Sequence, residues 1–153
     1  MEAFNITHLF FQNAEAHPQK TAIIEGDKQL TFGELSEQIN QTVAYFHSKG
    51  IQKGDRVLVF VPMSLDLYRI VLALFKMGAT AVFLDEWVSK KRLELCCEIA
   101  DCKAIIGGWK VTVLSLFSST LRKIPIHLGV KLKNVALQTI VSQTEKTDTA
   151  LIT

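Results

Sequence analysis

Several features that mark large classes of protein are scarce or missing in this sequence. None of its apolar runs reaches the roughly 18 residues that a membrane-spanning helix needs. The N-terminal stretch lacks both the basic region and the unbroken apolar core of a secretory signal. Seventeen basic and fifteen acidic residues are mixed along the chain, so no basic patch suggests nucleic-acid binding. We therefore expect a cytoplasmic protein with no transmembrane segment and no nucleic-acid partner.

Motifs that hold phosphate groups or metal ions are also missing. The sequence contains neither G-x-G-x-x-G nor G-x-x-x-x-G-K-[ST], which argues against a complete dinucleotide or P-loop site. Its three cysteines, Cys96, Cys97 and Cys102, are a vicinal pair with a distant third, which is not the spacing of metal ligands. We expect reduced, mostly buried thiols, no metal site, and no catalytic residue within the chain.

What is present is the composition of a globular domain. Apolar residues make up 48% of the 153 residues and charged residues 21%, which is enough to build one core over residues 1–153. The mean hydropathy of +0.22 is high for a complete soluble domain of this size. This value indicates apolar surface that meets a partner or a further part of the chain.

The order of apolar segments predicts an α/β fold. Strands buried on both faces are continuously apolar and rich in β-branched residues, as the segments near 56–61, 80–84, 103–107 and 135–141 are. Helical periodicity lies between them. Strands alternating with helices over short connections predict an open, mostly parallel sheet with helices on both faces. The expected helices cover residues 6–17, 31–49, 65–77, 89–100 and 109–121, and a hairpin with a Gly26-Asp27 turn precedes the second helix.

Local sequence patterns predict the apolar face of the first helix and the ends of two others. Ile6, Leu9, Phe10 and Ala14 are expected to form the apolar face of the first helix. A capping box at Thr31 and Glu34 starts the second helix. The helix at 65–77 begins after Ser64, ends at Gly78 and is apolar nearly all round, with Asp66, Arg69 and Lys76 as charged exceptions, so we expect it to be among the most buried elements.

Two groups of charged residues are candidates for ligand contact. Asp85 and Glu86 follow a strand at the edge where open α/β sheets bind ligands, although adjacent loop residues more often point apart into solvent. Lys90, Lys91 and Arg92 occupy the first turn of a helix, where cations are disfavoured. A solvated face is the simpler interpretation of the three cations. A contact to an anion, such as a phosphorylated cofactor, is the sharper hypothesis.

Four phrases in order resemble the adenylate-forming superfamily of acyl-CoA synthetases, adenylation domains and luciferase-like ligases. They are "HPQKTAIIEGDKQLTFGELSEQINQ", "GIQKGDRVLVFVPMS", "LALFKMGATAVFLD" and "KKRLELCCEIADCKAIIG". The resemblance runs over residues 5–107 and resumes at 148–153. Met63 stands where the family usually has Asn, and Glu86-Trp87-Val88-Ser89 replaces its prolines. The sequences of these segments are more similar to the fatty-acyl and β-lactone-forming branches of the family than to amino-acid adenylation domains.

The resemblance also explains the final phrase "DTALIT". In the family, such a strand precedes a glycine- and hydroxyl-rich loop that holds the phosphates of ATP, so we expect that loop just after Thr153 and a polar linker at 142–149. The chain would then be the incomplete N-terminal portion of the family's large domain, with no cofactor-binding motif of its own. It would be inactive alone and would self-associate through its uncovered surface.

For the full-length protein the resemblance implies a carboxylic acid substrate and ATP with Mg²⁺, with coenzyme A as a candidate acyl acceptor. Two other classes stay open from the residues alone. One is a stand-alone α/β module that binds a partner without catalysis. The other is an unrelated small enzyme of the flavodoxin-like type.

Overall fold

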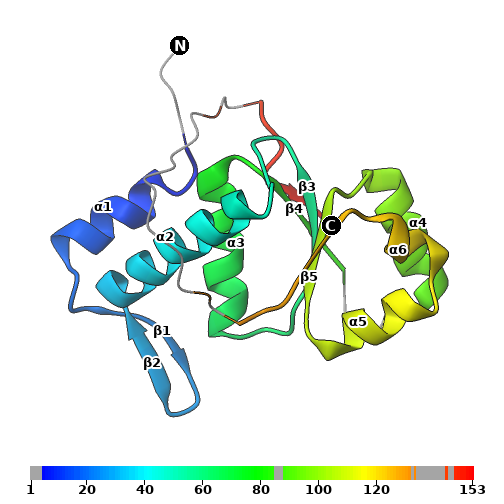
Figure 1. Cartoon of the computed structure of the whole chain (residues 1–153). Helices are drawn as coiled ribbons and strands as arrows, with labels where there is room; N and C mark the ends of the chain where they lie inside the picture. Colours follow the sequence, from blue (N-terminus) through cyan, green and yellow to red (C-terminus); the bar gives the residue numbers. More distant parts are fainter. Residues whose placement is uncertain (1–4, 85–87, 132, 134–143, 145–146) are drawn as a thin grey trace.

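The computed structural model describes residues 5–84, 88–131, 133, 144 and 147–153. Figure 1 shows the chain arranged in layers around one sheet. The described helices are α1 His8–Ala16, α2 Phe32–Ser48, α3 Leu65–Met77, α4 Lys90–Ala100, α5 Trp109–Leu116 and α6 Ser119–Lys123. The described strands are β1 Thr21–Glu25, β2 Lys28–Thr31, β3 Arg56–Phe60, β4 Thr80–Phe83, β5 Ala104–Gly107, β6 Ile126–Leu128 and β7 Leu151–Ile152.

The main sheet is parallel and five-stranded, which confirms the predicted fold class. Its strand order is β6-β5-β3-β4-β7, and every described pair runs parallel. β3 lies in the centre because the chain crosses first to β4 on one side and then back to β5 on the other. Right-handed crossovers in opposite directions place helices on opposite faces of the sheet. The strand expected at 135–141 lies outside the described residues.

Alternate residues of the central strands divide the core into two clusters. Val57 and Val59 of β3 pack against α2 and α3, whereas Leu58 between them packs against α4, α5 and α6. Strand residues alternate between faces, so a strand covered on both sides must be apolar at every position. Figure 1 shows the same division, with α2 and α3 on one side of the sheet and α4, α5 and α6 on the other.

The predicted caps are present at α2 and α3. The Thr31 hydroxyl accepts from the Glu34 N–H at 3.2 Å, and the Glu34 carboxylate accepts from the Thr31 N–H at 2.8 Å. Ser64 accepts from the Leu67 N–H at 3.3 Å, and Gly78 closes α3 with φ of 70°. Each pair satisfies backbone groups that the helix end would otherwise leave without partners.

The structure corrects two helix predictions. The single helix expected at 109–121 is two helices, because Ser118 is extended and its hydroxyl accepts from the Leu121 N–H at the start of α6. In α1 the expected apolar face is wrong at Ile6 and Leu9, which are both exposed, and Ile6 also precedes the helix. The helix instead packs through Phe10, Phe11 and Ala14. The Phe10 ring lies 5.7 Å from that of Phe32, which ties α1 to the start of α2.

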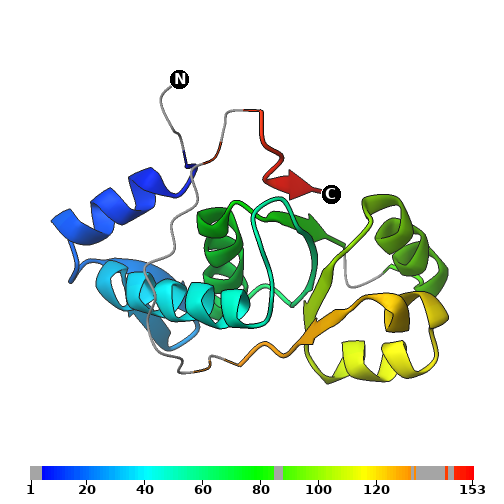
Figure 2. The same cartoon turned by 45° about the horizontal axis from the view of Figure 1, so that its top comes forward.

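Two short strands complete the fold. β1 and β2 form the expected antiparallel hairpin, a separate two-stranded sheet with Gly26 at φ of 58° in its turn. β7 adds to the free edge of β4, where the Ala81 N–H donates to the Ala150 carbonyl at 2.9 Å (Figure 2). The last described strand therefore ends at the same edge of the sheet as the carboxyl ends of β3, β4 and β5.

Candidate functional site

The carboxyl ends of the parallel strands meet at one edge of the sheet, which is where open α/β folds bind ligands. Gly107 ends β5 there in close contact with its neighbours. A Cβ at this position would lie 2.9 Å from the Phe60 carbonyl oxygen and 2.3 Å from a methyl carbon of Val111. Only glycine lets the end of β5 approach both β3 and the start of α5.

Arg69 is a buried charge on α3, beside this edge. Its side chain is only 3% exposed. One guanidinium nitrogen donates to the Thr42 hydroxyl at 2.7 Å, and the other donates to the Asp66 carboxylate and the Val130 carbonyl, each at 2.6 Å. Arg69 therefore joins α2, α3 and the segment that follows β6. Its Nε is buried without a hydrogen-bond partner.

The cations predicted as anion contacts divide into two groups. Lys90 donates to the Phe117 carbonyl and lies 3.8 Å from the Glu94 carboxylate, so it connects α4 to the end of α5. Lys91 and Arg92 are exposed on the first turn of α4. An anion contact at these two residues stays a prediction, and the structure makes Lys90 the weakest candidate of the three.

The other carboxylate candidates, Asp85 and Glu86, lie outside the described residues. Among the residues that the structure does describe, no three histidine, cysteine or acidic side chains gather in a way that could hold a metal ion. Over the same residues, no helix combines the length and the apolar character needed to cross a bilayer.

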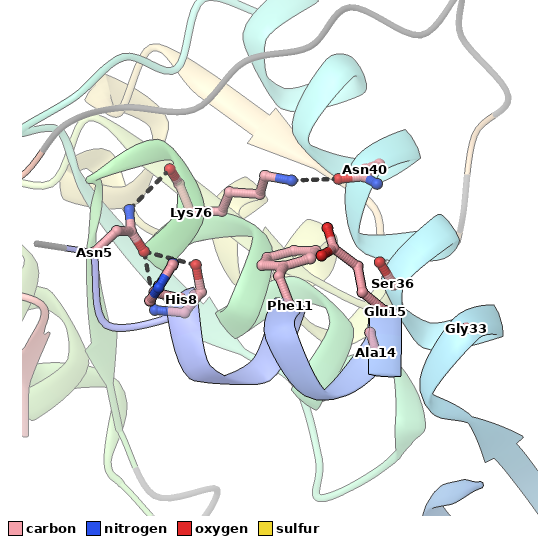
Figure 3. A pocket seen from close by; sticks show the side chains of 10 residues that line it. Asn5, His8, Phe11, Ala14, Glu15, Gly33, Ser36, Asn40 and Lys76 are labelled. Atoms are coloured by element: carbon pink, nitrogen blue, oxygen red, sulfur yellow. Dashed lines mark hydrogen bonds between the residues drawn. The ribbon is translucent and has the colours of Figure 1, made fainter. Parts of the chain in front are cut away.

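A hollow lies between α1, α2 and α3 (Figure 3). Its volume is about 390 Å³. Lys76 extends from α3 toward Asn40 of α2, which accepts a hydrogen bond from its ammonium group at 2.5 Å, and the ammonium also lies 3.9 Å from the centre of the Phe11 ring. Burial lowers the pKa of Lys76. Asn5 closes one end by donating to the carbonyls of Phe75 and Lys76.

Sequence reasoning missed the structural roles of Arg69 and Lys76. Both stood out only as charged interruptions of an apolar helix, which usually point to solvent. Arg69 lies three residues after its partner Asp66, whereas Lys76 lies far along the chain from Phe11. The i,i+3 pair of Asp66 and Arg69 could have been found, whereas the contact between Lys76 and α1 depends on the tertiary fold.

Comparison with known proteins identifies the family to which the sequence is similar. The family model described as AMP-binding enzyme matches residues 10–151. Tyrocidine synthase 2 of Brevibacillus parabrevis is 31% identical over 101 residues, which are 66% of this chain and 3% of that protein. Malpinin synthetase of Mortierella alpina is 29% identical over an alignment of 143 residues that covers 84% of this chain and 2% of that protein.

Solved structures share the fold at low identity. The anthranilate CoA ligase AuaEII superposes with a TM-score of 0.83 at 17% identity, over 99% of this chain and 32% of the other. The N-terminal domain of FACL13 from Mycobacterium tuberculosis gives a TM-score of 0.81 at 19% identity, over 97% of this chain and 41% of the other. The chain thus spans less than half of the proteins that it resembles.

The family match covers most of the chain, and the parallel sheet is the architecture that the resemblance implied. The chain belongs to the AMP-binding enzyme family of adenylate-forming enzymes.

Proposed function

We propose that residues 1–153 serve as the N-terminal part of an enzyme that couples a carboxylic acid to AMP. In that reaction a carboxylate oxygen attacks the α-phosphorus of ATP, the acyl–AMP bond forms, and pyrophosphate leaves. The observation that carries the proposal is the match to the AMP-binding enzyme family over residues 10–151. ATP, Mg²⁺ and a cytoplasmic location belong to the same proposal, as does a later transfer of the acyl group to coenzyme A.

The described residues support a scaffolding role for this part of the enzyme. Phosphoryl chemistry of this kind requires donors and a metal ion positioned around the phosphates. The carboxyl edge of β3, β4 and β5 instead offers a close glycine contact and a buried arginine network, which shape the edge of the sheet. We propose that the phosphate-binding loop follows β7, which lies beside β4 at this edge. Lys91 and Arg92 remain candidates for contacting an anionic part of the substrates.

The acyl group is the least determined part of the proposal. The sequence motifs favour a fatty acid as the substrate, whereas the relatives described above are a tyrocidine synthase and a malpinin synthetase. We retain the fatty-acyl substrate as the proposal and treat amino acids as the competing outcome. Both classes present a carboxylate to ATP, so one assay can compare them.

Pyrophosphate exchange tests the function on the natural protein. An antibody raised against residues 1–153 would capture that protein from its source, and the captured material would be incubated with ATP, Mg²⁺, labelled pyrophosphate and separate panels of fatty and amino acids. We expect exchange that depends on the added acid and is highest with fatty acids. Exchange with amino acids alone would reverse the substrate class, and no exchange with either panel would favour the non-catalytic module.

The 153-residue chain by itself is the matched control for that experiment. We expect it to give no exchange above the blank, because it contains no phosphate-binding loop. Exchange by the chain alone would show that residues within 1–153 can hold ATP, and would remove the reason for treating them as one part of a larger site.

We also propose that the isolated chain self-associates through α5. Trp109, Val113 and Leu116 are exposed at helical spacing on this short helix, and the exposed Phe117 follows directly at its end. Apolar stripes of this kind recruit partners, and a stable interface buries at least roughly 1,000 Å². Light scattering over a dilution series should give a mass above 17.1 kDa that falls on dilution.

Two variants identify the surface in that experiment. Trp109→Lys combined with Leu116→Lys should leave a monomer at all concentrations, because both changes put a charge into the apolar stripe. Gln12→Lys combined with Gln19→Lys is the control, since both residues are exposed and lie on or just after α1, away from α5, and the two changes add the same charge. A wild-type monomer at high concentration, or equal effects of both variants, would contradict the proposed interface.

A further inference from the structure

The end of α4 brings two of the three cysteine side chains together. Asp101 leaves the helix in the left-handed conformation, with φ of 50°. The chain then turns back so that the Cys102 N–H donates to the Cys97 carbonyl at 3.2 Å, and both cysteine side chains are buried in the same core cluster. Disulfides join residues whose Cα atoms are about 4.4–6.8 Å apart. A direct backbone hydrogen bond between the same two residues brings their main chains close enough for such a bond.

Cys102 also lines an open cavity of about 510 Å³ at the amino ends of β3, β5 and β6, which is the opposite edge of the sheet from the candidate site. Its charged lining consists of the cations Arg56, Lys103 and Lys123 and the carboxylates Asp55 and Asp101. The Asp55 carboxylate already accepts from the Gln52 N–H at 2.8 Å. The cations outnumber the carboxylates, so the lining favours an anion beside the Cys102 sulfur.

The two thiols differ in their readiness to react. The neighbouring Cys97 thiol, followed by the Arg56 guanidinium, lowers the pKa of Cys102 despite its burial. The neighbouring Cys102 thiol, together with burial, raises the pKa of Cys97. Cys102 lines the cavity and Cys97 does not, so an incoming disulfide meets the Cys102 sulfur first. Since a thiolate is the nucleophile in disulfide exchange, we assign Cys102 as the attacking sulfur and Cys97 as the resolving one.

We propose that Cys97 and Cys102 form a redox-active dithiol that reacts with small anionic disulfides entering this cavity. The Cys102 thiolate attacks one sulfur of the incoming disulfide, and the first small thiolate leaves as the mixed bond forms. Cys97 then gives up its proton, attacks the Cys102 sulfur and releases the second small thiol. The protein loses two hydrogens and gains one S–S bond, and the small disulfide is reduced to two thiols.

The product would be a covalent link between α4 and the residues that lead into β5. Cys97 lies in the last turns of α4, and Cys102 immediately precedes Lys103, whose N–H donates to the Arg56 carbonyl at 2.8 Å at the start of β3. The bond would therefore fix the end of α4 to the amino edge of the sheet. Cys96 is not buried with this pair and is expected to remain a free thiol.

Alkylation and mass spectrometry test the dithiol on the native 153-residue chain. The reduced protein would be incubated with oxidised glutathione, quenched with an alkylating agent and mapped by peptide mass. We expect a Cys97–Cys102 disulfide, with only Cys96 alkylated. Attachment of glutathione to Cys96 alone, a Cys96–Cys97 bond, or no reaction without denaturant would each overturn the proposal. This readout does not involve acyl adenylation, so it succeeds or fails independently of the proposed function.

Serine variants separate the roles of the two sulfurs. Cys97→Ser should stop at a mixed disulfide between Cys102 and glutathione, because the resolving thiol is missing. Cys102→Ser should leave Cys97 unmodified, and Cys96→Ser should react as the wild type does. Stable modification of Cys97 in the Cys102→Ser variant would contradict the assignment of the nucleophile. If a variant fails to fold, the wild-type peptide map still decides whether the disulfide forms.

The charge of the cavity provides a second measurement. Oxidised glutathione should react faster than the cationic disulfide cystamine, by at least about threefold at low salt, because the cations of the lining attract an anion. Lys103→Gln combined with Lys123→Gln should bring the two rates closer together. Equal rates for both reagents in the wild type would contradict the preference for anionic disulfides.

Discussion

Replacing Arg69 by alanine should lower the free energy of unfolding by about 2–4 kcal/mol, since it leaves a cavity and removes three hydrogen bonds from a buried position. The Val130 carbonyl would lose a donor that lies 2.6 Å away, and the Thr42 hydroxyl would keep only its bond to the Gln38 carbonyl. Thr42 is 1% exposed, so water cannot easily replace the lost partner. Urea unfolding followed by tryptophan fluorescence would measure the loss.

Two further variants separate the causes of that loss. Arg69→Met fills most of the volume but donates no hydrogen bond, so its cost reports the polar contacts alone. Asp66→Asn tests the exposed partner, whose side chain is 51% exposed, and should cost less than about 1 kcal/mol. If Arg69→Met is as stable as the wild type, the arginine hydrogen bonds contribute nothing measurable. If Asp66→Asn costs as much as Arg69→Ala, the ion pair rather than the buried network dominates.

Features that depend on neighbours along the chain could be predicted from the sequence. The capping box at Thr31 and Glu34 needs only a spacing of three residues, and both of its hydrogen bonds are present. The central strands need only a short apolar, β-branched run, and β3, β4 and β5 lie within the expected ranges. Their parallel pairing followed from the helices between them, because crossover connections leave few other arrangements.

Features that depend on the tertiary fold were harder to predict. The α1 periodicity predicted a face that included Leu9, but Leu9 is 66% exposed and the helix packs on α2 through Phe10 and Phe11. β6 has three residues and includes His127, so its apolar pattern is too short to stand out. It is nevertheless a strand because the open edge of β5 pairs with it.

The candidate sites show the same limit. Lys90 looked like one of three equivalent cations, but the end of α5 brings the Phe117 carbonyl within reach of Lys90. Cys97 and Cys102 are separated by too many residues for helical neighbours, yet the left-handed Asp101 returns the chain so that they meet. In both cases the residue types were visible in the sequence, whereas the contact partners were supplied by a turn or by a distant helix.

Leu74→Ala should cost about 2–5 kcal/mol of unfolding free energy, because truncating a fully buried leucine removes apolar contacts and leaves a cavity. Leu74 is 0% exposed and belongs to the core cluster between the sheet and the helices α2 and α3. The Ala79 N–H donates to the Leu74 carbonyl at 2.9 Å, across the Gly78 cap. This hydrogen bond fixes the backbone at Leu74, so the helix relaxes little into the cavity. Urea unfolding would give the change in the midpoint and in the slope.

Leu72 on the same helix is the matched control, because the chemical change is identical and only the burial differs. Its side chain is partly buried and packs at the margin of the same cluster, so Leu72→Ala should cost clearly less than Leu74→Ala. The apolar pattern of 65–77 alone cannot rank these two leucines, since nearly every position of the helix is apolar. Equal losses would mean that both sides of α3 are covered to the same extent in solution. A loss below about 1 kcal/mol for Leu74→Ala would contradict the central position of α3 in the core.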